Sequence, residues 1–355
     1  MIYFLLPILS LFAAIIKLLN IKETKSAYKF LMALIFMFYF IIVALRGEGI
    51  GTDYYAYGGL FSSPDNIEPG FALLIKLTKL ISNDYRFFII VVFSITLFLR
   101  YKLFKKLSGE ISISMLMLFG FWMLVYDMNG IRQGLSLSFI GFAGYYAYKR
   151  DFWKFFAFTI VATSIHYSSI MFFPFYFIFN LKLNKQHMIF IILILYFMAI
   201  VNISGYLFSF VLESSAKGIF LDKVSTYSNM SEFNSNTIFS FNTFHRLLIF
   251  FVVVFTIDKI PINQDLRKFL LYAAFMNVAI FLLLSRFELI AVRGSLPYRY
   301  FELIFFSYLP FAFKDRNQRI WTVLILFVYI IFQIYTTTNV SSEDNTLIPY
   351  RTIFG

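Results

Sequence analysis

The stretch YKFLMALIFMFYFIIVAL, residues 28–45, is an apolar run in which Lys29 is the only charged side chain. A helix of this length crosses, or nearly crosses, the roughly 30 Å of hydrocarbon in a bilayer. Similar runs recur along the whole chain, at 2–19, 86–103, 111–126, 131–148, 152–166, 167–181, 188–204, 240–257, 268–285, 295–313 and 320–337. We therefore predict an all-α fold, a polytopic bundle of about twelve transmembrane helices, in which 152–181 forms either two short spans or one tilted helix.

The composition excludes an ordinary soluble enzyme. Apolar residues make up 60% of the 355 residues and charged residues only 14%, whereas a globular chain carries about 25% charged residues. Cys is absent and the three His are far apart, so thiolate sites are excluded and no cofactor or His-rich metal site is expected; carboxylate-bound Mg²⁺ or Ca²⁺ stays open. The net charge of +12 is scattered between apolar runs and does not indicate nucleic-acid binding.

Lys and Arg are distributed differently between alternate loops. If the N-terminus is outside, the inner side holds fourteen Lys and five Arg, Arg100 among them, as the positive-inside rule requires. The outer side holds only four Lys but eight Arg, which are Arg46, Arg86, Arg132, Arg246, Arg286, Arg293, Arg299 and Arg351. Because a planar guanidinium suits bidentate binding of phosphate or carboxylate, we expect an anionic ligand at the outer face. The alternative is that these Arg pair with outer acids or with lipid headgroups.

Nothing in the sequence divides the chain into separate domains. No repeat with a period of 20 to 50 residues and no long Pro- or Ser-rich linker is present, so we expect a single integral membrane domain over residues 1–355. Its first helix lacks a preceding basic segment and is expected to stay uncleaved. Outer loops are expected near 46–85 and 205–239. Within the first of them, PGFALLIKLTKLIS at 69–82 predicts an amphipathic helix on the outer surface.

The first outer loop, residues 45–71, contains a glycine pattern and an acidic aromatic cluster. The glycines at 47–51 follow no strand, so they do not indicate nucleotide binding and more simply let the backbone turn. Asp53 lies beside Tyr54 and Tyr57, and a carboxylate among aromatic rings offers a sugar both an acceptor and a stacking face. An interfacial aromatic belt is the alternative explanation for the tyrosines.

Arg132 and Gln133 lie where one helix has ended at Asn129-Gly130 and the next begins. A guanidinium there adds to the positive end of the new helix dipole, which favours an anion. The alternative is that Asp127 neutralises Arg132.

Three further segments place histidine or arginine side chains at the expected outer ends of spans. His166 follows an apolar run at a predicted outer turn, where it is either a packing residue or a group that transfers protons near neutral pH. His245 and Arg246 open a span from the outside. Arg299 and Glu302, spaced by three, are expected to neutralise each other, yet ionisable groups within a membrane are functional candidates.

Taken in order, these segments resemble the EpsG-type branch of the Wzy polysaccharide polymerases, which are polytopic bacterial membrane proteins. The resemblance rests on Arg46 with the Gly-Thr-Asp53-Tyr loop, then on residues 129–134, 164–169, 293–301 and 349–351. It implies polymerisation of polyprenyl-diphosphate-linked oligosaccharide repeat units on the outer face of the bacterial cytoplasmic (inner) membrane. The partners implied are membrane lipids, the lipid-linked oligosaccharide, a flippase and a chain-length regulator. The lipid diphosphate would be the leaving group.

The resemblance also suggests roles for individual residues. His166 or Asp53 would accept the proton of the attacking sugar hydroxyl. The residues expected to bind the diphosphate are Arg132, Arg293, Arg299 and Arg46. Those expected to contact the rest of the substrate are Tyr54, Tyr57, Gln133, His245, Arg246, Glu302 and Arg351.

Other membrane functions share many of these features. A flippase or transporter of lipid-linked oligosaccharide should show internal repeats and a polar cavity at mid-membrane, whereas the polar groups here concentrate at one rim. A ligase that moves finished glycan to another acceptor is barely separated from a polymerase by sequence. A membrane-bound O-acyltransferase and a purely structural membrane protein fit less well.

The predicted topology can be tested by labelling, because the chain contains no Cys. Ser62→Cys and Ser168→Cys should react with an impermeant thiol reagent added to intact cells. Ser108→Cys should react only after the membrane is opened. The reverse pattern would overturn the assignment of inside and outside.

Overall fold

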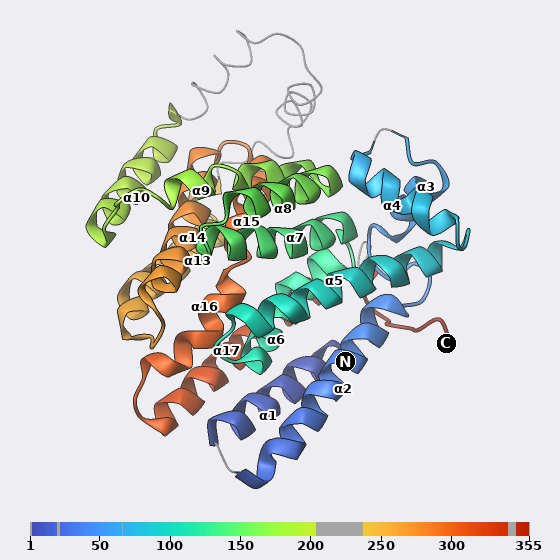
Figure 1. Cartoon of the computed structure of the whole chain (residues 1–355), viewed down its shortest axis with the longest axis horizontal. Helices are drawn as coiled ribbons and strands as arrows, with labels where there is room; N and C mark the ends of the chain where they lie inside the picture. The colour runs from blue at the N-terminus through green and yellow to red at the C-terminus, as the bar shows by residue number, and fades with distance from the viewer. Residues whose placement is uncertain (1, 20–21, 66, 204–236, 340–345, 355) are drawn as a thin grey trace. The chain divides into compact units, whose positions relative to one another are not determined.

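The computed structural model describes residues 2–19, 22–65, 67–203, 237–339 and 346–354, and within these residues the chain is helical without a strand (Figure 1). The predicted all-α class is therefore confirmed. Six helices in this part are long and apolar enough to cross a membrane, at Ile2–Leu19, Lys25–Ala44, Tyr85–Leu107, Phe241–Lys259, Gln264–Leu283 and Arg316–Thr338. Shorter apolar helices occupy other predicted spans, so the count of about twelve stays a prediction.

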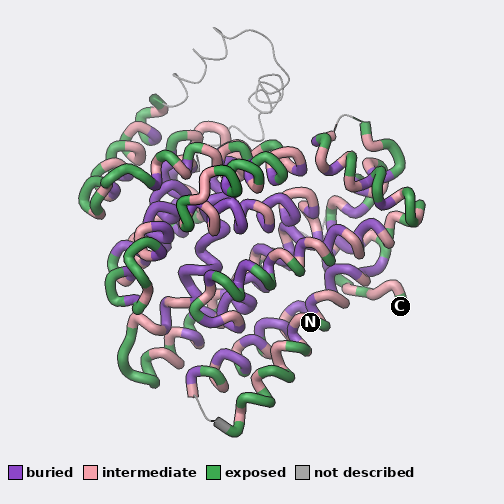
Figure 2. Tube along the Cα trace, in the orientation of Figure 1, coloured by how far each residue is buried: buried purple, intermediate pink, exposed green. Residues whose placement is uncertain are grey.

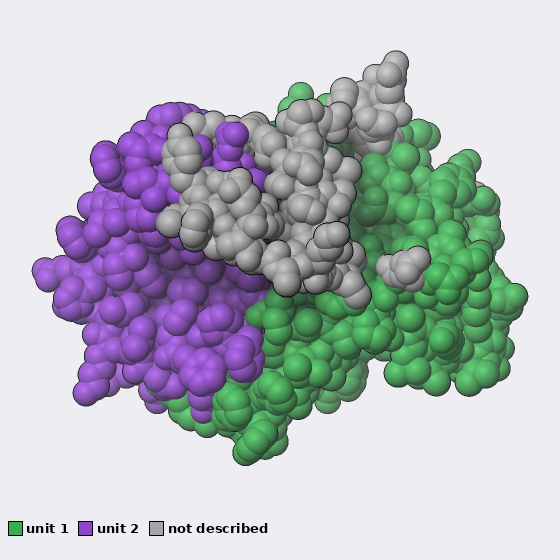
Figure 3. Space-filling view, turned by 90° about the horizontal axis from the view of Figure 1, so that it is seen from above, with its two compact units in different colours: residues 1–170, 259–261, 303–355 green, residues 171–258, 262–302 purple. Residues whose placement is uncertain are grey.

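The helices group into two compact units, coloured separately in Figure 3. Unit 1 comprises residues 1–170, 259–261 and 303–355, and unit 2 comprises 171–258 and 262–302. The helices of unit 1 are α1 (Leu5–Leu19), α2 (Lys25–Ala44), α3 (Tyr54–Ser62), α4 (Pro69–Lys79), α5 (Tyr85–Leu107), α6 (Ile111–Leu118), α7 (Ile131–Tyr148), α8 (Phe152–Ile165) and α17 (Arg316–Thr338). Those of unit 2 are α9 (Phe175–Ile178), α10 (Lys185–Ile200), α13 (Phe241–Thr256), α14 (Gln264–Leu283) and α15 (Glu288–Arg299). Helix α16 (Glu302–Tyr308) begins with the last residue of unit 2 and continues in unit 1.

Each unit has its own pattern of helix packing. In unit 1, α7 packs against α5 and α8, while α1 packs against α2, α6 and α17. In unit 2, α14 packs against α10, α13 and α15. Helices α7 and α14 are buried along most of their length, whereas only a minor part of α17 is buried (Figure 2). In a membrane protein, the bilayer covers exposed apolar helix faces such as those of α17. The expectation of one integral membrane domain stays a prediction.

Two predicted spans are interrupted helices. The run at 111–126 is α6 followed by the π-helical turn η3 (Met123–Asp127), and 295–313 is divided between α15 and α16. After α6 ends, the backbone N–H of Phe121 donates to Gln333 Oε1 on α17 at 3.2 Å. A Cβ at Gly120 would lie 2.4 Å from that same oxygen. The glycine therefore allows α17 to replace the hydrogen bond that the helix has lost.

A buried ion pair joins α5 to the turn η3. Arg100 Nη1 lies 2.5 Å from Asp127 Oδ2, both side chains are fully buried, and Tyr39 hydrogen-bonds to the same carboxylate. The predictions that Arg100 lies in an inner loop and that Asp127 neutralises Arg132 are therefore wrong. Helix α5 continues to Leu107, so Arg100 lies about 10 Å inside its end, where a charge must be paired.

The C-terminal segment pairs with the first loop. Gly47 N donates to Arg351 O at 2.8 Å, and Ile353 N donates to Leu45 O at 3.0 Å. Gly49 and Gly51 have φ angles of 77° and 102°, which confirms that the glycines let the backbone turn. The second predicted outer loop, 205–239, lies almost wholly outside the described residues.

Gly51 gives a test of this loop, with Gly59 as its matched control. Gly51→Ala should lower the free energy of unfolding by about 1–3 kcal/mol, because φ is positive there and the new Cβ would lie 2.5 Å from Met128 O. Gly59→Ala, inside α3 with no atom within 4 Å of a new Cβ, should stabilise the protein by about 0.5–1 kcal/mol. Thermal unfolding in detergent measures both. Equal effects of the two changes would contradict this description of the turn.

Candidate functional site

Three side chains from distant parts of the sequence meet in unit 1 around a carboxylate. Arg132 Nη1 donates to Glu68 Oε2 at 2.6 Å, and His166 Nδ1 lies 3.4 Å from Glu68 Oε1. Glu68 is only 4% exposed, whereas the side chains of Arg132 and His166 are 25% and 13% exposed. We call these three residues the Glu68 cluster. Its carboxylate is enclosed, and its cation reaches the surface.

Helix ends and one close contact bring the Glu68 cluster together. Glu68 immediately precedes α4, where Pro69 starts the helix, and the Glu68 side chain makes no capping hydrogen bond. Its carboxylate is therefore available to other partners. A Cβ at Gly70 would lie 2.2 Å from Ser164 Oγ, so α4 approaches α8 very closely at this glycine. That approach places Glu68 next to His166, which follows the last residue of α8.

Aromatic rings hold Arg132 in place. It is the second residue of α7, which begins at Ile131, so its predicted position at a helix start is confirmed. The guanidinium carbon lies 5.5 Å from the centre of the Tyr57 ring and 5.9 Å from that of Phe71, both at cation–π distance. Its Nε is buried without a hydrogen-bond partner among the described residues. Arg132 is thus fixed in orientation while part of its hydrogen-bonding capacity remains unused.

The charge state of Glu68 follows from its neighbours. Burial alone would raise the pKa of this carboxyl group, but the adjacent imidazole of His166 and the charge of Arg132 outweigh burial and lower the pKa to about 2. Glu68 is therefore an anion at any physiological pH. It can orient and stabilise a cationic neighbour, but it is too weak a base to take a proton from a sugar hydroxyl.

The other predicted residues of the first loop lie near the start of α3. Asp53 precedes that helix and is partly exposed. Tyr54 is buried, and its backbone oxygen accepts a hydrogen bond from the Tyr85 hydroxyl at 3.0 Å. Of these residues, Tyr57 is the one that contacts the Glu68 cluster. Gln133, next to Arg132, has an Nε2 without a hydrogen-bond partner among the described residues.

Arg46 and Arg351 are not members of the Glu68 cluster. Arg46 is 2% exposed and donates through Nη1 to Val43 O at 2.9 Å. It lines a cavity of about 10 Å³ with Asp127, room for about one water molecule. A diphosphate could contact Arg46 only if the surrounding side chains moved. Arg351 is exposed and donates to Glu48 O at 3.1 Å.

A second polar cluster lies in unit 2 and is centred on Asn277 of α14. Arg246 donates to the Asn277 side-chain oxygen, and Asn277 Nδ2 donates to Glu302 Oε1 at 3.0 Å. Glu302 Oε2 lies 3.5 Å from Arg299 Nε, which confirms the predicted neutralisation of these two residues. We call Arg246, Asn277, Arg299 and Glu302 the Asn277 cluster. It holds two guanidinium groups and one carboxylate, all buried.

Two further predicted residues of unit 2, His245 and Arg293, are not members of this cluster. His245, on α13 next to Arg246, is 7% exposed and stacks on Phe241 with ring centres 6.0 Å apart. Arg293 is partly exposed on α15, and a separation of six residues places it on a different face from Arg299. No group of three or more His, Asp or Glu that could hold a metal ion occurs among the described residues.

Sequence reasoning missed the two residues at the centres of these clusters. Glu68 lies in the loop before α4, and its signal is an acid directly before a proline that starts an amphipathic helix. Asn277 lies in the run LLYAAFMNVAIF, and its signal is a single amide within an apolar span. Both signals indicate a polar partner but not which one.

The Glu68 carboxylate should contribute to stability in a pH-dependent way. Glu68→Gln should lower the free energy of unfolding by about 2 kcal/mol at neutral pH, because it removes a charged hydrogen bond. Since the pKa is lowered from 4.5 to about 2, this difference from wild type should be complete above pH 4.5 and shrink as pH falls toward 2. Thermal unfolding at several pH values measures it.

Glu48→Gln serves as the matched control. Glu48 pairs with Arg86 at 3.6 Å, but both side chains are about half exposed, so the change should cost below about 1 kcal/mol. An effect of Glu68→Gln no larger than that of the control, or one that grows below pH 4.5, would contradict the described role of Glu68.

Comparison with known proteins identifies one family. The EpsG family matches residues 29–352, which is most of the chain. No curated protein and no solved structure matches the chain. The family indicates a glycosyltransferase-like polysaccharide polymerase of exopolysaccharide biosynthesis, which would act on a lipid-linked oligosaccharide. The apolar helices agree with a multi-pass membrane protein. The chain belongs to the EpsG family.

Proposed function

We propose that the chain polymerises polyprenyl-diphosphate-linked oligosaccharide repeat units on the outer face of the bacterial cytoplasmic membrane. The growing glycan on its lipid diphosphate is the donor, and a sugar hydroxyl of the next lipid-linked unit is the acceptor. The hydroxyl oxygen bonds to the anomeric carbon of the donor as the bond from that carbon to the diphosphate breaks. The Glu68 cluster supports this proposal best, because it combines a histidine, a carboxylate and a guanidinium.

In this reaction His166 accepts the proton of the attacking hydroxyl. The Glu68 anion beside Nδ1 favours the tautomer with a proton on Nδ1, which leaves the lone pair of Nε2 to accept the proton. Nε2 is buried, so the hydroxyl reaches it only when neighbouring side chains move. The same anion stabilises the imidazolium that forms. Asp53 is the other candidate base. Because it is not a member of the Glu68 cluster, we favour His166.

Arg132 stabilises the negative charge that develops on the leaving diphosphate. Its guanidinium is already oriented by Glu68 and by the rings of Tyr57 and Phe71, so little reorganisation is needed during the reaction. Glu68 cancels much of the charge of Arg132, so we expect further cations to bind the diphosphate. In unit 2, Arg299 pairs with Glu302, which is linked to Arg246 through Asn277, and Arg293 is partly exposed. That Arg293 and Arg299 bind a diphosphate stays a prediction from the sequence.

Analysis of surface glycan after deletion of the gene in its native host tests the reaction class. A polymerase defect leaves single repeat units at the surface. A flippase defect instead leaves lipid-linked units on the cytoplasmic side of the membrane. A ligase defect leaves finished polymer on its lipid carrier. Either of the last two results would contradict the proposed polymerisation.

Variants expressed in that deletion strain test the roles of individual residues. Arg132→Lys keeps the charge but loses the planar fork, and His166→Gln loses the base. Each should lower the amount of long polymer about 100-fold or more, at unchanged protein level. Arg86→Lys is the matched control, because Arg86 forms an exposed pair with Glu48 and should support normal polymer. Normal polymer length in Arg132→Lys would argue against a diphosphate role.

A further inference from the structure

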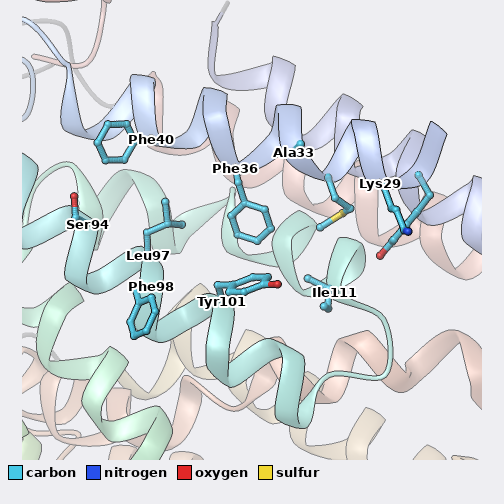
Figure 4. Close-up of a pocket in the computed structure, with 11 residues that line it drawn as sticks. Lys29, Ala33, Phe36, Phe40, Ser94, Leu97, Phe98, Tyr101 and Ile111 are labelled. Carbon is cyan, nitrogen blue, oxygen red and sulfur yellow. The ribbon is translucent and has the colours of Figure 1, made fainter. Parts of the chain in front are cut away.

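An apolar groove of about 640 Å³ runs between α2 and α5 in unit 1, with Ile111 of α6 at one end (Figure 4). Lys29, Ala33, Phe36 and Phe40 line it from α2, with spacings of three or four residues that place them on one face of the helix. Its volume is in the range of sites for small ligands. The Glu68 cluster lies outside it, so this groove is separate from the candidate functional site.

The length of the groove matches one leaflet of a bilayer. Lys29 and Phe40 are eleven residues apart, which corresponds to about 16 Å along α2. That is about half of the roughly 30 Å hydrocarbon thickness. Helix α5 runs the opposite way, so that Ser94 lies at the Phe40 end and Tyr101 lies toward the Lys29 end (Figure 4). A partner helix would need a groove along the whole span, whereas an acyl chain needs only this half.

The two ends of the groove differ in charge. Lys29 is exposed and has no acidic group within ion-pair distance among the described residues. The buried carboxylate there, Glu110, is already bonded to the Tyr28 hydroxyl at 2.5 Å. The Phe40 end carries no charged lining residue.

We propose that this groove binds one anionic phospholipid. One of its acyl chains lies along Phe36, Phe40 and Leu97, and its phosphate lies at the Lys29 ammonium. The sequence predicts that this end of α2 faces the cytoplasm, so the lipid belongs to the inner leaflet. The proposal does not depend on the polymerase reaction, because it concerns a different face of unit 1.

Native mass spectrometry of the full chain in mild detergent tests the proposal, with phosphatidylglycerol or phosphatidylcholine as the added probe. The wild type should retain one phosphatidylglycerol, at an occupancy about fivefold above that of phosphatidylcholine, as expected for one lysine contact worth about 1 kcal/mol. Lys29→Gln should reduce this preference to about one. Lys25→Gln, an exposed lysine outside the groove, is the matched control and should keep it.

A second variant tests the acyl-chain part of the groove. Ala33→Trp fills the groove and should remove binding of both lipids, while size-exclusion chromatography confirms that the protein is folded. Equal retention of the two lipids by wild type, or an unchanged preference in Lys29→Gln, would overturn the proposal. So would a wild-type dimer that Ala33→Trp dissociates, because a second copy would then occupy the groove.

Discussion

A charge buried in an apolar interior is stabilised by a counter-charge, and this constraint organises the two buried ion-pair sites of unit 1. Burying an unpaired ion costs several kcal/mol even after the protein relaxes. Arg100 and Asp127 satisfy the constraint with 0% exposure of either side chain. Glu68 satisfies it through Arg132 and His166. Each pairing joins different elements of unit 1.

The two polar clusters meet this constraint differently. In the Glu68 cluster the anion is enclosed and the cation reaches the surface, so the exposed part of the cluster is positive and near a histidine. In the Asn277 cluster an amide lies between Arg246 and Glu302, and every member is buried. A partly exposed cluster suits binding and chemistry, whereas a fully buried chain of polar groups mainly holds helices in register. This difference is the reason to place the proton transfer at His166.

Local sequence was enough to predict features that depend on neighbouring residues. The helical class, the turn at Gly49 and Gly51, and the start of a helix just before Arg132 all follow from patterns within a few residues. The partners of Glu68 could not be predicted, because they depend on the close contact between Gly70 and Ser164. Similarly, the sequence presents Arg100 as one more basic residue near an inner loop. Only the structure shows that α5 continues to Leu107, so that Arg100 lies within the helix. Spans broken by turns, such as 111–126, look continuous to a hydropathy pattern because the breaking segments are themselves apolar.

The pairing of the C-terminal segment with the first loop has a consequence for the order in which the molecule is made. Gly47 and Leu45 find their backbone partners in Arg351 and Ile353, about three hundred residues later in the chain. During translation, the backbone N–H of Gly47 must wait until residues through Arg351 have left the ribosome. This loop therefore reaches its final form late in biogenesis, well after α2 and α5 have been inserted. A nascent chain stalled before residue 346 would hold the membrane helices without this closure.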